Sequence, residues 1–533
     1  YYYLNGKEIC DYLIDPPQTN YQKQIFYRSY DITEFIKEGG NAFVAQLGQG
    51  FYSQDRAWKT YPKTRYGKEC FIGCIKLEYE NGVEYIKTNT KDWKYIYSPV
   101  ILNNVYGGEI YDARFEVDNF TLYGGDDDGF MKVVEDVTPK GKLIPCNIPP
   151  VRVIKEIKAK SIKHANGVRD GAWIIDIGEN IAGVVEIKIP RSPVGATYVL
   201  RYAETLDQLG KLDFRSTGAY ANQMIQQDIY IAKGVDGETY RPKFTYHGFR
   251  YVEITGIHDL TDKYGTVPKA SMLTAYAISS DVQKTCEFNT SNEYLSKFNQ
   301  IIDRTVRSNL HGVPTDCPVR ERCGWMGDAQ INCNLLLSCY DTQAIYQKYY
   351  NDIITSKEVN GYVTNISPGM RTNRQAFPNY GASVVVIAYW LYKYYGDTQT
   401  VTENFKHIQE WVEEIKSRSV NYIVDQGLGD WDPPVEQDSP RRMPKSHAAT
   451  FTFYEVCLMT AELCFNLSLG DGNYYLDLAK KVKDAVIENF YDHENHTYGY
   501  WASNGGALHL GLYPDGEKQA LLDATAKLME KDN

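Results

Sequence analysis

Hydrophobic and polar residues alternate with a period of two along the first part of the chain. From Tyr1 to about Lys132, short runs rich in Tyr, Ile, Val and Phe are separated by turn clusters such as Glu80-Asn81-Gly82. Such alternation, broken by Gly and Asn, is typical of half-buried strands joined by tight turns. We therefore predict an antiparallel β-sandwich over residues 1–135.

A second strand-rich region follows this first one. It contains the runs 173–178, 184–189 and 198–202, which are rich in Ile, Val and Tyr and are separated by Gly, Pro and Asp. β-branched and aromatic residues in short runs favour strands, and the residues between them favour turns. The pattern predicts a second antiparallel sandwich over residues 136–282.

After about Ser291 the period of the pattern changes to that of an α-helix. Leu295, Phe298, Ile302 and Val306 fall on one helical face,. Further helix-like segments, for about seven helices in all, begin near Asp328, Gly381, Val401, Ser446, Asn473 and Asp515.

These helix-like segments are of two kinds. Segment 384–395 is apolar nearly all round, whereas segment 405–415 is apolar on one side only. A helix that is apolar all round is buried, and a one-sided helix faces solvent. The pattern therefore predicts a helical domain over residues 283–533 with an inner and an outer layer.

Composition and charge narrow the classes of function. A chain of 533 residues with 43% hydrophobic and 23% charged residues is expected to form roughly two to four globular domains,. No stretch of about 18 uncharged apolar residues offers a membrane span. The net charge of −11 argues against nucleic acid as the main ligand,. We expect a soluble protein, and both a cytoplasmic and an exported location stay open.

The cysteines indicate no metal site. The chain contains 11 cysteines, and they form no CxxC pair and no Cys/His cluster with the spacing of zinc ligands,. We predict no structural metal.

Charged residues are concentrated between the first two predicted helices, in segment 314–330. If Asp316, Glu321 and Asp328 converge, like-charge repulsion and partial burial would keep one carboxyl group protonated near neutral pH, as a general acid requires. The neighbouring Arg320 and Arg322 would lower nearby pKa values or bind hydroxyl groups. The alternative is a solvated loop in which Asp316 or Asp328 caps a helix, and spacing alone does not decide between them.

A second acidic segment with an indole ring lies further along the chain. Asp430 and Trp431 are followed by Glu436 and Asp438 in a predicted loop between helices. Alone, such a segment is more often a turn with a packed ring. Two loops of this composition at one end of a helical array are suited to holding and cleaving a sugar.

Segment 316–330 reads Asp-Cys-Pro-Val-Arg-Glu-Arg-Cys-Gly-Trp-Met-Gly-Asp-Ala-Gln. It resembles the signature of the bacterial α-L-rhamnosidases of glycoside hydrolase family 78, in the form that lacks an extra Asp before the Glu. The resemblance implies that Glu321 is the general acid. The residues that it places against the rhamnose are Asp316, Arg320, Trp325 and Asp328.

The likeness extends over nearly the whole chain. Residues 429–431 resemble a second site segment of the family, so Asp430 and Trp431 are also expected to bind substrate. Residues 3–7 and 108–114 resemble the family's N-terminal sandwich. Residues 176–183 and 244–251 resemble its next sandwich, of the jelly-roll or concanavalin-like type.

The family fold implies that residues 283–533 belong to an (α/α)6 barrel, which has more helices than the pattern predicts here. The glutamate that serves the family as general base, in a Trp-Glu context, is not found in the sequence. Glu436 and Asp430 are candidate substitutes. We expect a barrel that is incomplete at its C-terminal end, with the general base beyond Asn533.

The function implied by the resemblance is hydrolysis, with inversion, of terminal non-reducing α-L-rhamnose from glycosides or polysaccharides. No cofactor is required, and a homodimer is left open. The alternatives are a catalytically inactive rhamnose-binding homologue, or a glycosidase or lyase for another deoxysugar on the same barrel. Tyr380 stands where the family often has Trp, which leaves the leaving-group preference open.

Overall fold

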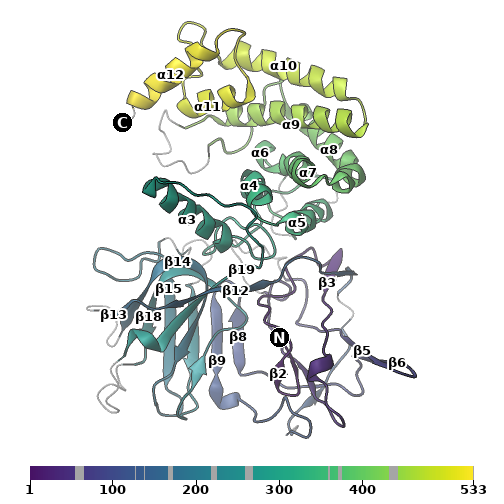
Figure 1. Cartoon of the computed structure of the whole chain (residues 1–533), viewed down its shortest axis with the longest axis vertical. Coiled ribbons are helices and arrows are strands. Elements are labelled where there is room, and N and C mark those ends of the chain that lie inside the picture. Colours follow the sequence, from purple (N-terminus) through teal and green to yellow (C-terminus); the bar gives the residue numbers. More distant parts are fainter. Residues whose placement is uncertain are drawn as a thin grey trace. The chain divides into compact units, whose positions relative to one another are not determined.

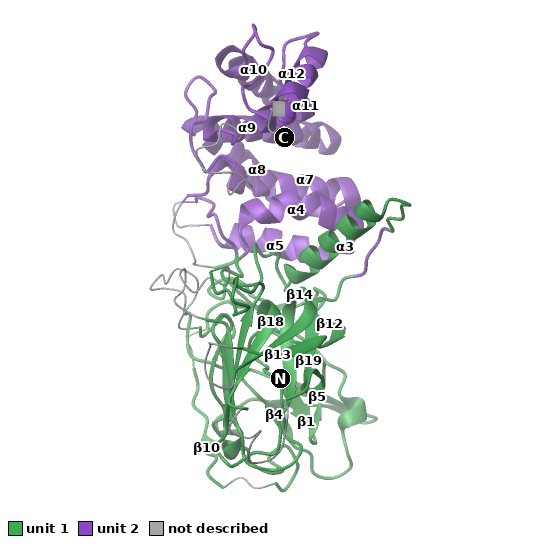
Figure 2. Ribbon diagram, turned by 90° about the vertical axis from the view of Figure 1, so that its left-hand side faces the viewer, with its two compact units in different colours: residues 1–282, 287–323, 368–371 green, residues 283–286, 324–367, 372–533 purple. Residues whose placement is uncertain are grey.

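The computed structural model divides the chain into two compact units (Figures 1 and 2). Unit 1 comprises residues 1–282, 287–323 and 368–371, and unit 2 comprises residues 283–286, 324–367 and 372–533. The structure describes all residues except 55–64, 126–127, 137–138, 166–171, 216, 218–224, 258–267, 358–360, 370–374, 431–441 and 532–533.

Unit 1 is built around one large sheet. Among the described residues, ten strands join in the order β12-β19-β14-β18-β15-β16-β9-β8, with β13 and β17 paired to β14. Figure 1 shows β14, β15 and β18 together in this sheet. The strands are β8 (Val100–Asn104), β9 (Gly108–Asp112), β12 (Val151–Lys158), β13 (Ser161–His164), β14 (Trp173–Lys188), β15 (Thr197–Ala203), β16 (Gln227–Ile231), β17 (Thr239–Tyr240), β18 (His247–Thr255) and β19 (Leu273–Ser280).

Both faces of the large sheet are covered along β14. Successive side chains of a strand point to opposite faces. Val185 packs with Ile175 and Val252 in one buried cluster, whereas Val184 packs with Val105 and Ile278 in another. Burial on both faces explains why this strand is nearly continuous in its hydrophobic residues.

The remaining strands of unit 1 form small sheets. These strands are β1 (Tyr2–Leu4), β2 (Lys7–Glu8), β3 (Gln24–Tyr27), β4 (Phe43–Ala45), β5 (Cys74–Tyr79), β6 (Gly82–Lys87), β7 (Lys94–Tyr95), β10 (Met131–Lys132) and β11 (Lys142–Pro145). Most pairings are antiparallel, but β9 runs parallel to β16 and β3 runs parallel to β11. Since β9 and β16 belong to regions that the sequence assigned to separate sandwiches, the division at residue 135 stays a prediction.

Helix α3 (Glu293–Ser308) leads from the sheet to the charged segment. The side chain of Asn292 caps α3 by accepting hydrogen bonds from the backbone N–H groups of Tyr294 and Leu295. After the helix, Ser280 N donates to Leu310 O at 2.7 Å, and Gly312 N donates to Ser280 Oγ at 2.9 Å. The chain is therefore tied to the end of β19 just before segment 314–330 begins.

Unit 2 is helical. Its helices are α4 (Met326–Cys339), α5 (Gln343–Thr355), α6 (Pro378–Gly381), α7 (Ser383–Tyr395), α8 (Thr398–Arg418), α9 (Lys445–Leu467), α10 (Gly472–Phe490), α11 (Trp501–Leu510) and α12 (Lys518–Lys531). The predicted change from a strand-rich to a helical region is confirmed, as are the helices expected near Asp328, Gly381, Val401, Ser446, Asn473 and Asp515.

Burial along the helices matches the two predicted kinds. In α7, residues 383–389 and Leu391 are buried, so this helix lies in the interior of the unit. In α8, burial is confined to positions such as Phe405, Ile408 and Trp411, which recur on one face. Among the described residues, α9 alone has the length and apolar composition of a membrane span, and 67% of that window is buried in the protein, as in a core helix.

Candidate active site

Residues 316–323 form a closed loop in unit 1. Asp316 N donates to Cys323 O at 3.1 Å, and Cys323 N donates back to Asp316 Oδ1 at 2.9 Å. Within the loop, Glu321 N donates to Cys317 Sγ at 3.4 Å, and Cys323 Sγ donates to Glu321 O at 2.9 Å. Both backbone polar groups of Glu321 are therefore held by cysteine side chains.

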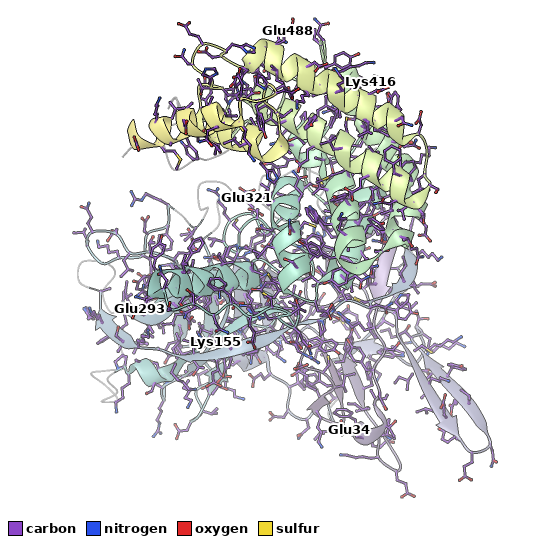
Figure 3. The ribbon with its side chains drawn as sticks, turned by 45° about the horizontal axis from the view of Figure 1, so that its top comes forward. Glu34, Lys155, Glu293, Glu321, Lys416 and Glu488 are labelled. Atoms are coloured by element: carbon purple, nitrogen blue, oxygen red, sulfur yellow. The ribbon has the colours of Figure 1, made fainter. Side chains whose placement is uncertain are left out.

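Glu321, labelled in Figure 3, is mostly buried. Its side chain is 13% exposed, and its Oε1 lies 3.4 Å from Nε of Arg320, whose side chain is 50% exposed. Partial burial of Glu321 agrees with what a general acid needs. A nearby guanidinium favours the ionised carboxylate, but an ion pair with a half-exposed partner is weakened by solvent.

Asp316 stabilises the loop and does not cap α4. Its Oδ1 accepts the hydrogen bond from Cys323 N, while the N-cap of α4 is Trp325, which makes no side-chain cap hydrogen bond. The helix-cap interpretation therefore fails for this carboxylate. Burial, followed by the nearby charge of Asp316, raises the pKa of Cys317, so this cysteine stays a thiol at neutral pH,.

Arg322 is buried, whereas Arg320 is half-exposed. Arg322 is 1% exposed. Its guanidinium donates to Pro318 O at 2.8 Å, to Gln226 Oε1 at 2.6 Å and to Val105 O. The sequence predicted that Arg320 and Arg322 would lower nearby pKa values or bind hydroxyl groups. Burial lowers the pKa of His247, and the charge of Arg322 acts in the same direction. The guanidinium donors of Arg322 are used by acceptors of unit 1, so a hydroxyl group of a substrate is not among the partners that the structure shows.

Unit 2 continues the segment with an aromatic cluster. Trp325 immediately precedes α4, and its ring meets the Tyr380 ring edge to face, with 5.7 Å between centroids. The Phe377 ring also meets the Tyr380 ring edge to face, with 6.0 Å between centroids. Gly327 permits this packing, because a Cβ there would lie 2.9 Å from the Tyr380 ring. Flat rings of this kind suit the apolar face of a sugar.

Asp328 lies in the first turn of α4 and is half-buried. Burial raises the pKa of this carboxyl group above its usual value. Its position near the helix N-terminus has the opposite effect, because the helix dipole favours a negative charge there. Asp328 is thus a perturbed carboxyl group of the kind expected at a functional site.

Asp430 lies in another loop of unit 2. Asp430 N donates to Met443 O at 3.1 Å, and Arg442 Nε donates to Asp430 O at 2.7 Å. The tight path requires Gly429, which has a φ of +70° and whose Cβ would lie 2.9 Å from Met443 O. The side chain of Asp430 is therefore carried by a fixed backbone. Trp431, Glu436 and Asp438 lie outside the described residues.

The described part of the chain contains no group of three or more His, Cys, Asp or Glu side chains that could hold a metal ion.

Three family models match consecutive parts of the chain. They are described as the α-L-rhamnosidase N-terminal domain, over residues 1–155, the bacterial α-L-rhamnosidase concanavalin-like domain, over residues 166–279, and the bacterial α-L-rhamnosidase 6 hairpin glycosidase domain, over residues 283–533. The chain belongs to the bacterial α-L-rhamnosidase family. The resemblance of segment 316–330 to the signature of this family is thereby confirmed at the level of the family.

Relatives within the family match over nearly the whole chain. An α-L-rhamnosidase of Formosa agariphila is 33% identical over 97% of this chain and 56% of its own length. The structure of an α-L-rhamnosidase from Dictyoglumus thermophilum is 32% identical, with a TM-score of 0.89, over 99% of this chain and 57% of that one. The crystal structure of an α-L-rhamnosidase of Streptomyces avermitilis complexed with L-rhamnose is 26% identical, with a TM-score of 0.90, over 100% of this chain and 50% of that one. The chain thus spans about half the length of these relatives.

Proposed function

We propose that the protein hydrolyses terminal non-reducing α-L-rhamnosides and that Glu321 is its general acid. The observation that carries this proposal is a mostly buried carboxyl group, held in a hydrogen-bonded loop that matches the family signature. The names of the relatives support the reaction, and the complex of the Streptomyces avermitilis enzyme with L-rhamnose supports the substrate class.

The proposed chemistry is a single displacement with inversion. Glu321 protonates the glycosidic oxygen as the bond to the anomeric carbon breaks, because an alkoxide is a poor leaving group. A second carboxylate activates a water molecule on the opposite face of the ring. The two carboxyl groups of an inverting glycosidase are about 6.5–9.5 Å apart, which leaves room for that water.

The other predicted site residues are proposed to hold the sugar. Asp316 and Arg320 offer an acceptor and donors for hydroxyl groups, and Arg320, being half-exposed, is able to turn from Glu321 toward the sugar. Trp325 provides an apolar wall, and Asp328 is a further acceptor. Asp430 and Trp431 are proposed to bind the same substrate from the second loop.

We also propose that the helices of unit 2 belong to an (α/α)6 barrel. The alternation of the buried helix α7 with the one-sided helix α8 supports an inner and an outer layer. The match of residues 283–533 to a 6 hairpin glycosidase domain supports the same arrangement.

The variant Glu321→Gln tests the role of the acid. Because positioned acids contribute about 10²–10⁴-fold, we expect the kcat of the full-length variant on an alkyl α-L-rhamnoside to fall by about that factor. Binding of L-rhamnose, measured by calorimetry, should persist, since the amide keeps the shape of the carboxyl group. Glu293→Gln, which changes an exposed glutamate in the first turn of α3 (Figure 3), should leave both quantities unchanged. An unaltered kcat in Glu321→Gln would rule out the assignment.

The products separate the proposal from its alternatives. Release of reducing L-rhamnose supports a hydrolase. Rhamnose binding by the wild type without any release would identify an inactive binding homologue, and an unsaturated product, detected by ultraviolet absorbance, would identify a lyase.

A further inference from the structure

Arg322 brings a positive charge into the interior of unit 1, directly beside the proposed acid in sequence. We propose that Arg322 is a positioning residue: it ties the Glu321 loop to the large sheet and so sets where Glu321 presents its proton. This inference rests on the proposed role of Glu321. The large sheet of unit 1 would then determine the position of Glu321.

All three guanidinium nitrogens of Arg322 donate hydrogen bonds. Nε donates within the loop to Pro318 O at 2.8 Å. The other two nitrogens donate to Val105 O, between β8 and β9, and to Gln226 Oε1 at 2.6 Å, next to β16. The guanidinium carbon also lies 4.6 Å from the centre of the Tyr246 ring. One side chain therefore joins the loop to three separate parts of the sheet.

Gln226 accepts a hydrogen bond from Arg322 and is itself held in place. It is 1% exposed, its Nε2 donates to Gly248 O at 2.9 Å, and its Oε1 accepts from Gly248 N at 2.9 Å. The amide is therefore fixed against the backbone of β18 as a neighbouring strand would be. The same Oε1 accepts hydrogen bonds from Gly248 N and from the Arg322 guanidinium, so the fixed amide also fixes the position of the guanidinium.

Buried polar side chains lie next to Gln226 and Gly248 along β16 and β18. Asp228 lies two residues after Gln226, and His247 lies just before Gly248. His247 Nε2 is 3.0 Å from Asp228 Oδ2, which also accepts from the Tyr202 hydroxyl at 2.6 Å. Asp228 and His247 are both 0% exposed. Hydrogen bonds therefore join Tyr202, Asp228 and His247 inside the sheet close to Gln226, while His247 Nδ1 has no hydrogen-bond partner among the described residues.

The loop also packs directly on β18. A Cβ at Gly248 would lie 2.5 Å from Val319 Cγ2, so only glycine allows this approach. At the other end of the loop, Arg322 has a φ of +46°, which non-glycine residues seldom adopt,. Such a conformation persists where surrounding contacts determine it. Glu321 thus lies between Val319, packed on the sheet, and Arg322, anchored in it.

The precision of this anchor matters because of what a general acid does. The acid must lie within hydrogen-bond reach of the glycosidic oxygen, and small displacements of catalytic groups reduce the rate strongly. Poor leaving groups need the proton, whereas a dinitrophenolate departs without it. A displaced acid should therefore slow the first class of substrate selectively, which a general loss of folded enzyme cannot do.

The test compares methyl and dinitrophenyl α-L-rhamnosides on variants of the full-length protein. Lysine keeps the charge of Arg322 but lacks the planar fork, so in Arg322→Lys we expect kcat on the methyl glycoside to fall about 10²-fold. On the dinitrophenyl glycoside kcat should stay within about two-fold, because little general acid catalysis is needed there. The Kd for L-rhamnose should not change. Gln226→Leu, which removes the acceptor of Arg322, should act in the same direction.

The matched control is Arg28→Lys. Arg28 is another mostly buried arginine of unit 1, which donates to the carbonyl groups of Cys146 and Ile148 and pairs with Asp15. This variant should affect both substrates equally. Equal losses on both substrates in Arg322→Lys, or in Gln226→Leu if the former does not fold, would overturn the inference. Glu321→Gln is assayed on the same two substrates. If Glu321→Gln loses kcat on the methyl glycoside alone while Arg322→Lys loses it equally on both, the positioning role of Arg322 is rejected and the proposed role of Glu321 stands.

Discussion

At the scale of single residues, unit 1 buries carboxyl groups that hydrogen bonds hold in place. Glu109 is 1% exposed and accepts hydrogen bonds from Lys243 N and Phe244 N at 3.1 Å and from the Tyr240 hydroxyl at 3.2 Å. Burial, followed by the nearby charge of Asp228, raises the pKa of Glu109 from 4.5 to about 7. Between pH 4.5 and about 7 the folded protein therefore binds a proton here that the unfolded chain has released,.

This carboxyl group makes stability depend on pH. Because its pKa is raised in the folded state, its contribution is fully present below pH 4.5 and is lost as the pH rises to about 7. Over this window the free energy of unfolding should fall by up to about 3 kcal/mol on account of Glu109. Urea unfolding of Glu109→Gln at about pH 5 and pH 8 should show a smaller decline than the wild type. Equal declines in the two proteins would contradict the assignment.

The roles of site residues could be predicted from the sequence only in part. The charged segment marked Glu321 and Asp316, since carboxylates, arginines and an indole ring are unusually dense there. Arg322 looked equivalent to Arg320, because two arginines on either side of Glu321 carry no sign in the sequence of which one is buried. Its partner Gln226 lies far away in the chain and becomes visible only when the sheet is formed.

At the scale of elements, close packing of helices depends on single small residues. Gly381, the last residue of α6, lies against Trp411 of α8, which is 1% exposed. A Cβ at Gly381 would lie 2.1 Å from the indole ring. The ring is held by its own buried surroundings, so there is no space for an added methyl group.

Substitution of this glycine should therefore weaken unit 2. We expect Gly381→Ala to reduce the free energy of unfolding by roughly 1–3 kcal/mol, the usual effect of overpacking a core. In Gly505→Ala, within α11, the added methyl group meets no atom within 4 Å. That change should be neutral or stabilise by about 0.5–1 kcal/mol through helix propensity. Calorimetric unfolding temperatures would measure both effects, and a Gly381→Ala protein as stable as the wild type would show that the contact is not tight.

The helices that the sequence did not predict have physical reasons for being missed. In α5 the buried residues include three tyrosines and the ion pair of Lys348 with Asp352, so the segment is not distinctly apolar in sequence. In α11 the adjacent residues Gly505 and Gly506 weaken the expectation of a helix,. Both helices are held by packing within unit 2 more than by local propensity.

At the scale of the whole molecule, the order of the regions was predictable and the long-range pairings were not. The change of period near Ser291 marks the passage from sheets to helices, because it depends on local patterns. The parallel pairing of β9 with β16 depends on residues more than a hundred positions apart and has no local signal,. The charged segment crosses from unit 1 to unit 2 between Cys323 and Gly324, so its residues are positioned by two separate cores.

Glu321 is proposed to donate the proton to the departing oxygen. The most direct test of this role is the dependence of kcat on leaving-group pKa across a series of aryl α-L-rhamnosides, measured for the full-length wild type and Glu321→Gln. We expect a shallow slope for the wild type and a steep one for the variant, and the two kcat values should converge for the most acidic phenol. Two parallel lines would contradict this role, because they would mean that the variant loses activity without losing proton donation.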